Sequence, residues 1–407
     1  MDDSMSEHCD IAIVGAGPYG LSLAAHLSAE GRSFRIFGKP LETWRAHMPI
    51  GMQLKSDGFA SNLSAPDPDS TLKAYCAARG LAYDDRHLPV SLALFNDYAQ
   101  WFQQSYVPML EEKLVCSLSG APGLYALTLD DGSTVMARRV VLAIGIGAFA
   151  HWPAEFEGLP DWAVSHSYDH HALDRLSGKN VLVLGAGASA IDIASLLADS
   201  GAAARLLARA PHIHFHSQPD PDNATWLRQI AHPSSGIGPG WRSFLCSNAP
   251  GLFHRMPERF RLAATRRHLG PAPGWFMRAR FEGQVETLLG HELIGASARG
   301  GVVMLQTRDA SGRETSLSAD HVIAATGYRT DLARLGFLDS RLRRTIAQVA
   351  GTPRLSDTFE TSRPGLYVIG PAAANSFGPL MRFMVGAEYV APRLARHLAR
   401  EASRKAA

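Results

Sequence analysis

Short apolar runs alternate with longer mixed segments along this chain, and two of these runs lead directly into a glycine-rich turn. Residues 11–14 (IAIV) precede residues 15–20 (GAGPYG), and residues 181–184 (VLVL) precede residues 185–190 (GAGASA). A brief apolar run that ends at a glycine turn is typical of a buried strand. The pattern therefore predicts two strand–turn units of the same design.

A helix-like stretch follows each turn and ends at a glycine, Gly31 in the first unit and Gly201 in the second. A second, largely apolar run closes each unit, at residues 34–37 and 204–208. Strand, crossover helix and second strand make a β-α-β unit, which builds a parallel sheet. We therefore predict an α/β fold with two Rossmann-like dinucleotide-binding domains.

The rest of the chain is less regular. Residues 40–110 are irregular, with helical patterns near residues 71–80 and 95–110, and residues 211–280 show only short periodic pieces. We expect hairpins at residues 124–144 and 292–324, because Asp-Gly and Gly-containing turns separate strand-like runs there. Residues 150–178 are predicted as a crossing loop between domains. The end returns to a strand at residues 366–370 and a helix from Pro379 onward.

Composition and charge exclude several classes of protein. The chain has 407 residues, of which 46% are hydrophobic and 19% charged, as in ordinary globular proteins. A net charge of +2 argues against a nucleic-acid partner. No apolar run approaches the roughly 20 residues that span a bilayer, and the first residues lack the pattern of a signal peptide. We expect a cytoplasmic protein without a membrane partner, and a homo-oligomer stays open.

Cysteine and histidine spacing gives no sign of a metal or disulfide centre. The cysteines are widely spread and none forms C-x-x-C, so a redox disulfide or thiolate metal site is not expected: Cys9, Cys76, Cys116 and Cys246. His212, His214 and His216 alternate and would share one face of a strand, a spacing that can ligate metal. We interpret them as part of a half-exposed strand and predict no metal.

The glycine turns have a specific chemistry. In G-x-G-x-x-G the first glycine makes the bend, the second lets the backbone approach a pyrophosphate, and the third lets helix and strand pack closely. The helix N-terminus offers unpaired N–H groups to the phosphates. In the first turn these positions are Gly15, Gly17 and Gly20, and Pro18 opens the helix. In the second turn they are Gly185, Gly187 and Ala190, with Ser189 before the third position. One chain is therefore predicted to hold two dinucleotides.

The ends of the second strands indicate which dinucleotide each turn takes. A carboxylate there binds the ribose 2′-hydroxyl, whereas an arginine binds a 2′-phosphate. Arg209 follows the second strand of the second unit with no acid nearby, which favours NADPH. In the first unit Gly38 and Lys39 occupy this place, so Glu42 or backbone groups must hold the ribose.

Further motifs follow in a fixed order. Thr43-Trp44-Arg45 comes after the first unit, and residues 324–328 (AATGY) come after the second. In this order the chain resembles the class B flavin-dependent monooxygenases over nearly its whole length. The resemblance implies FAD at the first turn and NADPH at the second. It also implies a discontinuous FAD domain, residues 1–165 and 321–407, with the NADPH domain, residues 166–320, inserted.

The resemblance also assigns roles to individual residues. Trp44 and Arg45 would lie along the FAD, and Asn62 resembles the family's active-site asparagine beside the flavin. Gln53 resembles a glutamine of the N-hydroxylating branch. Asn62 and Gln53 are therefore the candidate catalytic residues, with loop structure as the alternative for each.

Near the C-terminus the resemblance implies further cofactor contacts. Thr326 and Gly327 would end a strand next to the cofactors. Gly370 is followed by proline where many flavoproteins carry aspartate, so a carboxylate contact to the flavin is missing. Phe377 and Gly378 precede Pro379, which could open a helix whose N-terminus faces the flavin; an ordinary helix start is the alternative.

The implied reaction is a monooxygenation. NADPH would reduce FAD, O₂ would add at the flavin C4a carbon, and the (hydro)peroxide would transfer one oxygen atom to a small-molecule substrate, with Asn62 near the reactive carbon. The ketone-oxidising fingerprint F-x-G-x-x-x-H-x-x-x-W fits poorly around Phe156 and His166, which favours oxidation at nitrogen or sulfur. Two alternatives stay open: an NAD(P)H-dependent flavin oxidoreductase without oxygen insertion, and a nucleotide-binding protein without enzymatic activity.

Overall fold

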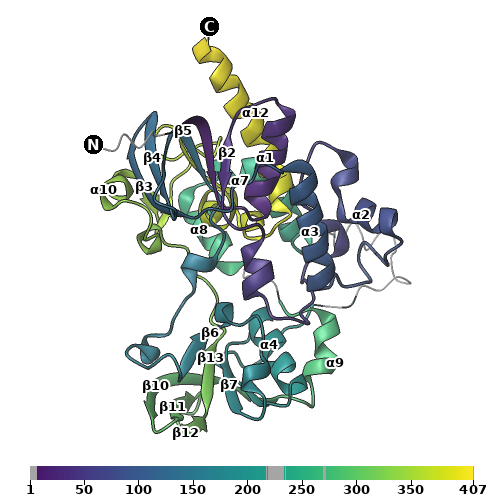
Figure 1. Cartoon of the computed structure of the whole chain (residues 1–407). Helices are drawn as coiled ribbons and strands as arrows, with labels where there is room; N and C mark the ends of the chain where they lie inside the picture. The colour runs from purple at the N-terminus through teal and green to yellow at the C-terminus, as the bar shows by residue number, and fades with distance from the viewer. Residues whose placement is uncertain (1–6, 217, 219–232, 234, 269–271, 407) are drawn as a thin grey trace.

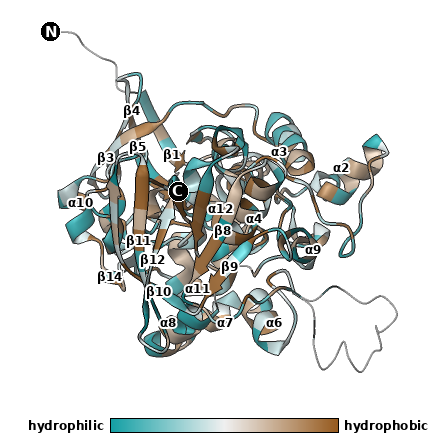
Figure 2. Cartoon of the chain, turned by 90° about the horizontal axis from the view of Figure 1, so that it is seen from below, coloured by the Kyte–Doolittle hydropathy of each residue, from teal (hydrophilic) through white to brown (hydrophobic). Residues whose placement is uncertain are grey.

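The computed structural model describes residues 7–216, 218, 233, 235–268 and 272–406, with side chains to Glu401. Two α/β domains lie one above the other, and both described ends of the chain belong to the upper one in Figure 1. Figure 2 shows the strands of the interior as mostly hydrophobic and several outer helices as hydrophilic. The predicted fold of two Rossmann-like domains is confirmed.

The first domain is built on a six-stranded sheet of order β2-β1-β5-β4-β3, with β16 pairing β5. β1, β2 and β16 run parallel to their partners, whereas β3, β4 and β5 form an antiparallel meander. Helices α1 and α12 pack against each other beside the sheet. The bounds are β1 (Glu7–Val14), α1 (Pro18–Ala29), β2 (Arg35–Phe37), β3 (Val115–Ala121), β4 (Leu124–Leu129), β5 (Thr134–Leu142), β16 (Leu366–Val368) and α12 (Gly386–Ala406).

The second domain is inserted into the first and carries a parallel sheet of order β6-β13-β7-β8-β9. Helix α4 covers one face, and the antiparallel meander β10-β11-β12 packs its apolar side, including Val303 and Leu305, on the other. The bounds are β6 (Val164–His166), β7 (Asn180–Leu184), α4 (Ala188–Asp199), β8 (Ala203–Ala208), β9 (Glu286–Leu289), β10 (His291–Arg299), β11 (Val302–Asp309), β12 (Glu314–Ala319) and β13 (His321–Ala324).

The two chain crossings between the domains pair with each other. Ala150 and Tyr328 form an antiparallel bridge, and the His151 N–H donates to the Gly327 carbonyl oxygen at 2.8 Å. The ring of Tyr328 also packs edge-on against His166 at the end of β6. The domain boundaries at 165/166 and 320/321 stay a prediction; β6 spans the first of them, and β13 begins directly after the second.

The remaining helices lie mostly in the connections of both domains. In the described part of the stretch after β8, where the sequence showed only short periodic pieces, there are four of them. They are α2 (Leu72–Arg79), α3 (Leu92–Tyr106), α6 (Trp241–Asn248), α7 (Pro250–Arg255), α8 (Glu258–Arg267), α9 (Arg278–Phe281), α10 (Ser340–Thr345) and α11 (Ala374–Phe377). A two-stranded ribbon, β14 (Gln348–Val349) and β15 (Thr352–Pro353), and single helical turns complete the fold: η1 (Thr43–His47), η2 (Gly58–Ala60), η3 (Pro68–Ser70), η4 (Gly147–Phe149), η5 (Ala154–Phe156), η6 (Ser167–Asp169), η7 (Asp174–Leu176), η9 (Trp275–Met277), η10 (Leu332–Arg334), η11 (Gly370–Ala373) and η12 (Pro379–Arg382).

Two predicted elements are wrong. The helix expected from Pro379 is a single turn, Pro379–Arg382, and the long helix starts only at Gly386, because the backbone is extended at Phe383. The strand expected at the alternating histidines is absent from residues 211–216, which form a bend and an irregular segment. Pro211 lacks the N–H that a continuing strand needs.

Candidate functional site

The first glycine turn connects β1 to α1. Gly15 has φ of +110°, and a Cβ atom there would lie 2.3 Å from the carbonyl oxygen of Ala143. A Cβ atom at Gly20 would lie 1.9 Å from the Gly15 carbonyl oxygen, whereas one at Gly17 would meet nothing within 4 Å. The first and third glycines are therefore needed for the fold, and the second faces open space.

The second glycine turn repeats this arrangement between β7 and α4. Gly185 has φ of +142°, and a Cβ atom there would lie 2.4 Å from the carbonyl oxygen of Ala325. A Cβ atom at Gly187 would again meet nothing within 4 Å. Ala190 takes the third position and is fully buried, so this contact accommodates a methyl group.

Both helix N-termini have the properties of an anion site. Gly17 caps α1 and Gly187 caps α4, neither offers a side chain to the N–H groups, and the first turn of each helix carries no acid. Pro18 opens α1, and Ser189 is exposed in the first turn of α4. Free N–H groups, the helix dipole and open space above the second glycine fit a dinucleotide pyrophosphate at each turn.

The strand ends beside the turns differ as the sequence indicates. Arg209 directly follows β8 and is exposed, so its guanidinium is accessible to a ligand. Gly38 follows β2 with φ of +138°, and a Cβ atom there would lie 3.0 Å from the backbone nitrogen of Ala16. The close approach to the first turn explains why no carboxylate stands at this position. Glu42 pairs with Lys39 at 3.3 Å on the surface.

Trp44 and Arg45 lie in η1, close to the first turn. The Leu41 N–H donates to the Ala16 carbonyl oxygen at 3.0 Å, and the Trp44 N–H donates in turn to the Leu41 carbonyl oxygen at 2.9 Å. The Trp44 ring packs 5.6 Å from the Phe95 ring. Arg45 is exposed and makes no ion pair within the described part of the chain, so its charge is available to a phosphate.

The side chain of Asn62 is engaged in holding its own loop. Its Oδ1 accepts from the Leu72 N–H at 2.9 Å, and its Nδ2 donates to the Phe59 carbonyl oxygen at 2.9 Å. Burial raises the pKa of Glu388, and a hydrogen bond from Asn62 partly lowers it. These contacts favour the structural interpretation of Asn62 in this conformation, and its role beside the flavin stays a prediction.

Gln53 lies in a loop that joins the two domains. It forms an isolated bridge with Ser91, the N-cap of α3, and its side chain is partly exposed. Two residues further on, Lys55 Nζ lies 2.5 Å from Asp192 Oδ1 in α4, with side-chain exposures of 9% and 3%. Burial raises the pKa of Asp192, and Lys55 counteracts this shift. No role was predicted for this pair from the sequence, although a buried-type position within a mostly apolar helix carries an acid at Asp192.

The predicted residues after β13 contact the other chain crossing, and Gly370 after β16 lies beside the first glycine turn. Thr326 donates a hydrogen bond to the His151 carbonyl oxygen, and Gly327 accepts from the His151 N–H, so both belong to the paired crossings. Gly370 has φ of +79° and faces the ring of Tyr19 in the first turn, 3.4 Å from its would-be Cβ atom.

Phe377 and Gly378 are covered by the helices α7 and α8. The Phe377 ring stacks on His254 with centroids 4.6 Å apart, and a Cβ atom at Gly378 would lie 3.2 Å from the Phe253 ring. Arg261 in α8 donates to the Ser376 carbonyl oxygen at 3.2 Å. The Phe377 side chain is buried, so only its backbone is available to a cofactor. This cover was not predicted, because no local sequence pattern marks His254 or Arg261.

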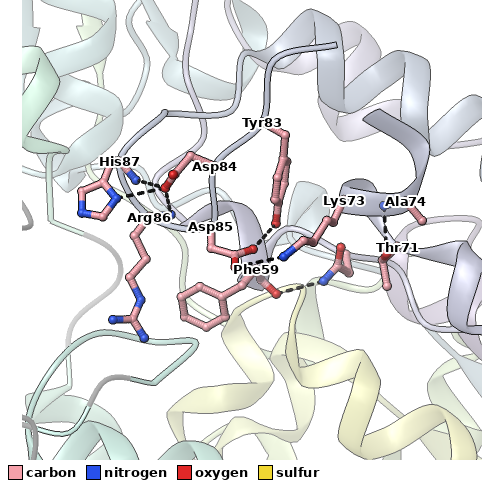
Figure 3. Close-up of polar contacts among 10 residues, drawn as sticks. Phe59, Thr71, Lys73, Ala74, Tyr83, Asp84, Asp85, Arg86 and His87 are labelled. Atoms are coloured by element: carbon pink, nitrogen blue, oxygen red, sulfur yellow. Dashed lines mark hydrogen bonds and ion pairs between the residues drawn. The ribbon is translucent and has the colours of Figure 1, made fainter. Parts of the chain in front are cut away.

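A pocket of 430 Å³, lined mainly by polar and charged side chains, lies next to Phe59 in the turn that precedes Asn62 (Figure 3). Apart from Arg86, its charged groups pair within the pocket: Asp84 accepts from the His87 ring, and Asp85 accepts from the Tyr83 hydroxyl and pairs with Lys73. Figure 3 shows these side chains turned toward each other, with Arg86 pointing away. We assign no chemistry to this pocket.

Within the described residues, no cluster of three or more histidine, cysteine or acidic side chains could hold a metal ion. Across the same residues, no helix is long and apolar enough to cross a membrane.

Two dinucleotide-binding folds, each with an open glycine turn at a helix N-terminus, define a protein built to bring two nucleotides together. The family model described as pyridine nucleotide-disulphide oxidoreductase matches residues 12–234. The chain belongs to this family, which confirms the prediction of an oxidoreductase. The chain itself has no C-x-x-C pair.

Individual relatives include both monooxygenases and reductases. The chain is 28% identical to the FAD-dependent urate hydroxylase of Xanthomonas campestris pv. campestris, over 48% of this chain and 43% of that protein. It is 25% identical to the ferredoxin–NADP reductase of Gluconacetobacter diazotrophicus, over 92% of this chain and 86% of that protein. For several such relatives the match spans about half of the relative's length.

The fold is shared with a solved N-hydroxylating enzyme. The ornithine N-hydroxylase of Kutzneria sp. 744 superposes with a TM-score of 0.77, at 17% identity, over 97% of this chain and 99% of that one. This likeness confirms the fold expected from the resemblance to class B flavin-dependent monooxygenases.

Proposed function

We propose that the chain is an FAD- and NADPH-dependent monooxygenase that inserts one atom of O₂ into a small-molecule substrate at nitrogen or sulfur. The observation that carries the proposal is the cover over residues 376–378. Helices α7 and α8 pack on the segment that the resemblance puts beside the flavin, through Phe253, His254 and Arg261. A site that transfers oxygen needs such protection from water, because reactive intermediates otherwise hydrolyse or leak protons.

The cofactor assignment rests on the geometry of the two turns. The first turn, with Gly17 at the N-terminus of α1, would hold the FAD pyrophosphate, with Arg45 as a nearby cation. The second turn, with Gly187 at the N-terminus of α4, would hold NADPH, and Arg209 would bind its 2′-phosphate. FAD, when bound, supplies hydride acceptance and oxygen activation.

The protein's own contribution is binding, orientation and exclusion of water. The paired crossings around Tyr328 join the two domains, and the loop that carries Gln53 lies between them. The Kutzneria enzyme was solved with reduced FAD, NADP⁺ and L-ornithine, so an amine is the substrate class we favour. The catalytic roles of Gln53 and Asn62, the domain boundaries, a cytoplasmic location and any homo-oligomer stay predictions.

The alternative function is an NAD(P)H-dependent flavin oxidoreductase that passes electrons to an acceptor without inserting oxygen. The match to a ferredoxin–NADP reductase over 92% of the chain favours this alternative. The absence of a C-x-x-C pair from the sequence argues against a dithiol route within it.

The deciding experiment measures where the electrons of NADPH go. The purified full-length chain, loaded with FAD, is given NADPH and air with a panel of diamines, amino acids with side-chain amines, and thioethers. We expect one of these to yield a product one oxygen atom heavier, in near-equal amount to the NADPH consumed. Complete conversion to H₂O₂ with every compound, together with anaerobic reduction of ferredoxin by NADPH, would overturn oxygen insertion and support the alternative.

A further inference from the structure

Residues 48–55, the interdomain loop, are hydrogen-bonded to both domains. On the side of the first domain, the Leu54 N–H donates to the Val90 carbonyl oxygen at 2.8 Å. On the side of the second domain, the Ile50 N–H donates to the His171 carbonyl oxygen at 2.9 Å. The loop, which also carries Gln53, therefore contacts both domains.

The loop ends in a buried ion pair with the second domain. Lys55 Nζ lies 2.5 Å from Asp192 Oδ1, and the two side chains are only 9% and 3% exposed. The ammonium group also lies 5.1 Å from the centroid of the Phe276 ring. Removing one partner of such a pair leaves an uncompensated charge in a poorly hydrated place, which is far more costly than losing a surface ion pair.

Asp192 lies on the helix whose N-terminus forms the second glycine turn. It stands five positions after the N-cap Gly187, which is about 7.5 Å along the axis at 1.5 Å per residue. A carboxylate at that distance opposes an anionic pyrophosphate at the helix N-terminus, and burial limits screening by salt. Lys55 cancels this charge, but it belongs to the first domain.

We propose that Lys55 and Asp192 are a positioning pair that couples nucleotide binding at the second glycine turn to docking of the interdomain loop. The inference rests on the proposed function, because NADPH is the nucleotide that this turn would take. When the loop is docked, the carboxylate is neutralised and the turn accepts phosphates. When the loop is undocked, the carboxylate loses its hydrogen-bonded cation, keeps only the weaker attraction of Arg280, and repels them. By linkage, nucleotide binding must favour the docked loop to the same extent.

The test uses the FAD-loaded full-length chain and NADP⁺, which binds without reacting. Titration gives the Kd for NADP⁺, and hydrogen–deuterium exchange reports on residues 48–56. In the unaltered chain we expect NADP⁺ to slow exchange in this segment. In Lys55→Met we expect a Kd about tenfold higher and no slowing of exchange by NADP⁺. Lys55→Arg keeps the cation and should stay within about threefold of the unaltered Kd.

The matched control is Arg280→Met. Arg280 pairs with Asp199, the last residue of the same helix, but both residues belong to the second domain. We expect its Kd for NADP⁺ to stay within about twofold of the unaltered value. The double variant Lys55→Met/Asp192→Asn removes both charges, so the Kd should recover while the effect of NADP⁺ on exchange stays lost. If Lys55→Met alone does not fold, this double variant still tests whether the ion pair couples the loop to nucleotide binding.

The outcomes separate this inference from the proposed function. A Lys55→Met chain that binds NADP⁺ as tightly as the unaltered chain, with the same protection of residues 48–56, overturns the positioning role. Equal weakening in Arg280→Met also overturns it, because the effect would then not depend on the interdomain loop. An unaltered chain that binds neither FAD nor NADP⁺ instead overturns the proposed function.

Discussion

The hydroxyl group of Tyr19 donates a hydrogen bond to the carbonyl oxygen of Phe383, at 2.8 Å. Tyr19 stands in the first glycine turn, and Phe383 lies between η12 and α12, near the other end of the chain. The same hydroxyl lies 3.1 Å from the carbonyl oxygen of Met381. One side chain thus links the turn proposed for FAD to the C-terminal segment that closes the first domain.

Replacing Tyr19 with phenylalanine should therefore weaken both the fold and the hold on FAD. The substitution removes a buried donor and leaves carbonyl groups without it, which typically costs about 1–3 kcal/mol. We expect a lower unfolding free energy in urea and a lower FAD content after gel filtration.

Tyr125→Phe is the matched control for that substitution. Tyr125 in β4 donates to the Pro364 carbonyl oxygen at 2.8 Å, outside both glycine turns. It should lose comparable stability and keep its FAD. If both variants keep FAD equally well, the link between Tyr19 and the cofactor site is wrong.

The bond between Tyr19 and Phe383 also explains an error of the sequence analysis. A proline after Gly378 and an apolar run predicted a helix from Pro379 onward. In the structure the carbonyl groups of residues 381 and 383 face the Tyr19 hydroxyl, and the backbone is extended at Phe383. Tyr19 precedes these two residues by more than 360 positions in the sequence, so no local pattern could reveal the contact.

The two β-α-β units were predictable because their signals are local. Strand, glycine turn and helix follow one another within about 30 residues, and Gly15 and Gly185 serve the same bend in both copies. The loop contacts of Asn62 and the pair of Lys55 with Asp192 depend instead on how distant segments meet. Their residue types were visible in the sequence, but their partners were not.

Replacing the second glycine of each turn with alanine should weaken cofactor binding and leave folding intact. Gly17 and Gly187 have φ of −83°, which alanine adopts readily, and a Cβ atom at either would meet nothing within 4 Å. The methyl group would instead occupy the space where a pyrophosphate approaches. Gly17→Ala should lose FAD, and Gly187→Ala should keep FAD but bind NADP⁺ at least about tenfold more weakly.

Gly15→Ala provides the contrast, because its Cβ atom would lie 2.3 Å from the Ala143 carbonyl oxygen. This variant should be destabilised outright. For all three variants, the absorbance of bound flavin gives the FAD content, titration gives the Kd for NADP⁺, and thermal unfolding gives the stability. Loss of FAD in Gly187→Ala with retention in Gly17→Ala would reverse the assignment of the two turns.

Substituting Arg209 with glutamine should change the choice of nucleotide and leave stability unaltered. Arg209 is exposed after β8, and exposed substitutions change stability by no more than about 0.5 kcal/mol. Loss of a charge-assisted hydrogen bond to a 2′-phosphate should lower the ratio of kcat/KM for NADPH to that for NADH by about 10–100-fold. An unchanged ratio in steady-state assays would show that another residue selects NADPH.

A chain of buried hydrogen bonds in the second domain has a defined direction. The carbonyl oxygen of Trp162 can only accept, so the His321 Nδ1 atom 2.8 Å away carries the proton. His321 Nε2 then accepts from the Ser165 hydroxyl, and Ser165 accepts from His170 Nε2, each at 2.6 Å. His170 Nδ1 accepts from Arg175 at 3.3 Å. Every group is satisfied only while both imidazoles are neutral.

Acid should therefore destabilise the fold through His170. Burial, reinforced by Arg175 and His321, lowers the pKa of His170 to about 4, whereas the unfolded side chain has an ordinary pKa of about 6.5. Above pH 6.5 both states are neutral and the group contributes no pH dependence. Between pH 6.5 and 4 only the unfolded chain takes up the proton, so stability falls by roughly 3 kcal/mol and then levels off.

The measurement is the unfolding free energy in urea at pH 7 and pH 4, for the unaltered chain and for His170→Gln. The substitution removes the titrating group, so the loss of stability between the two pH values should shrink by roughly 3 kcal/mol. His166 and His321 retain a residual slope, because burial also lowers the pKa of each. His212→Gln, at an exposed position, should reproduce the unaltered profile. If His170→Gln does so as well, His170 is protonated in the folded chain and the direction assigned to the hydrogen-bond chain is wrong.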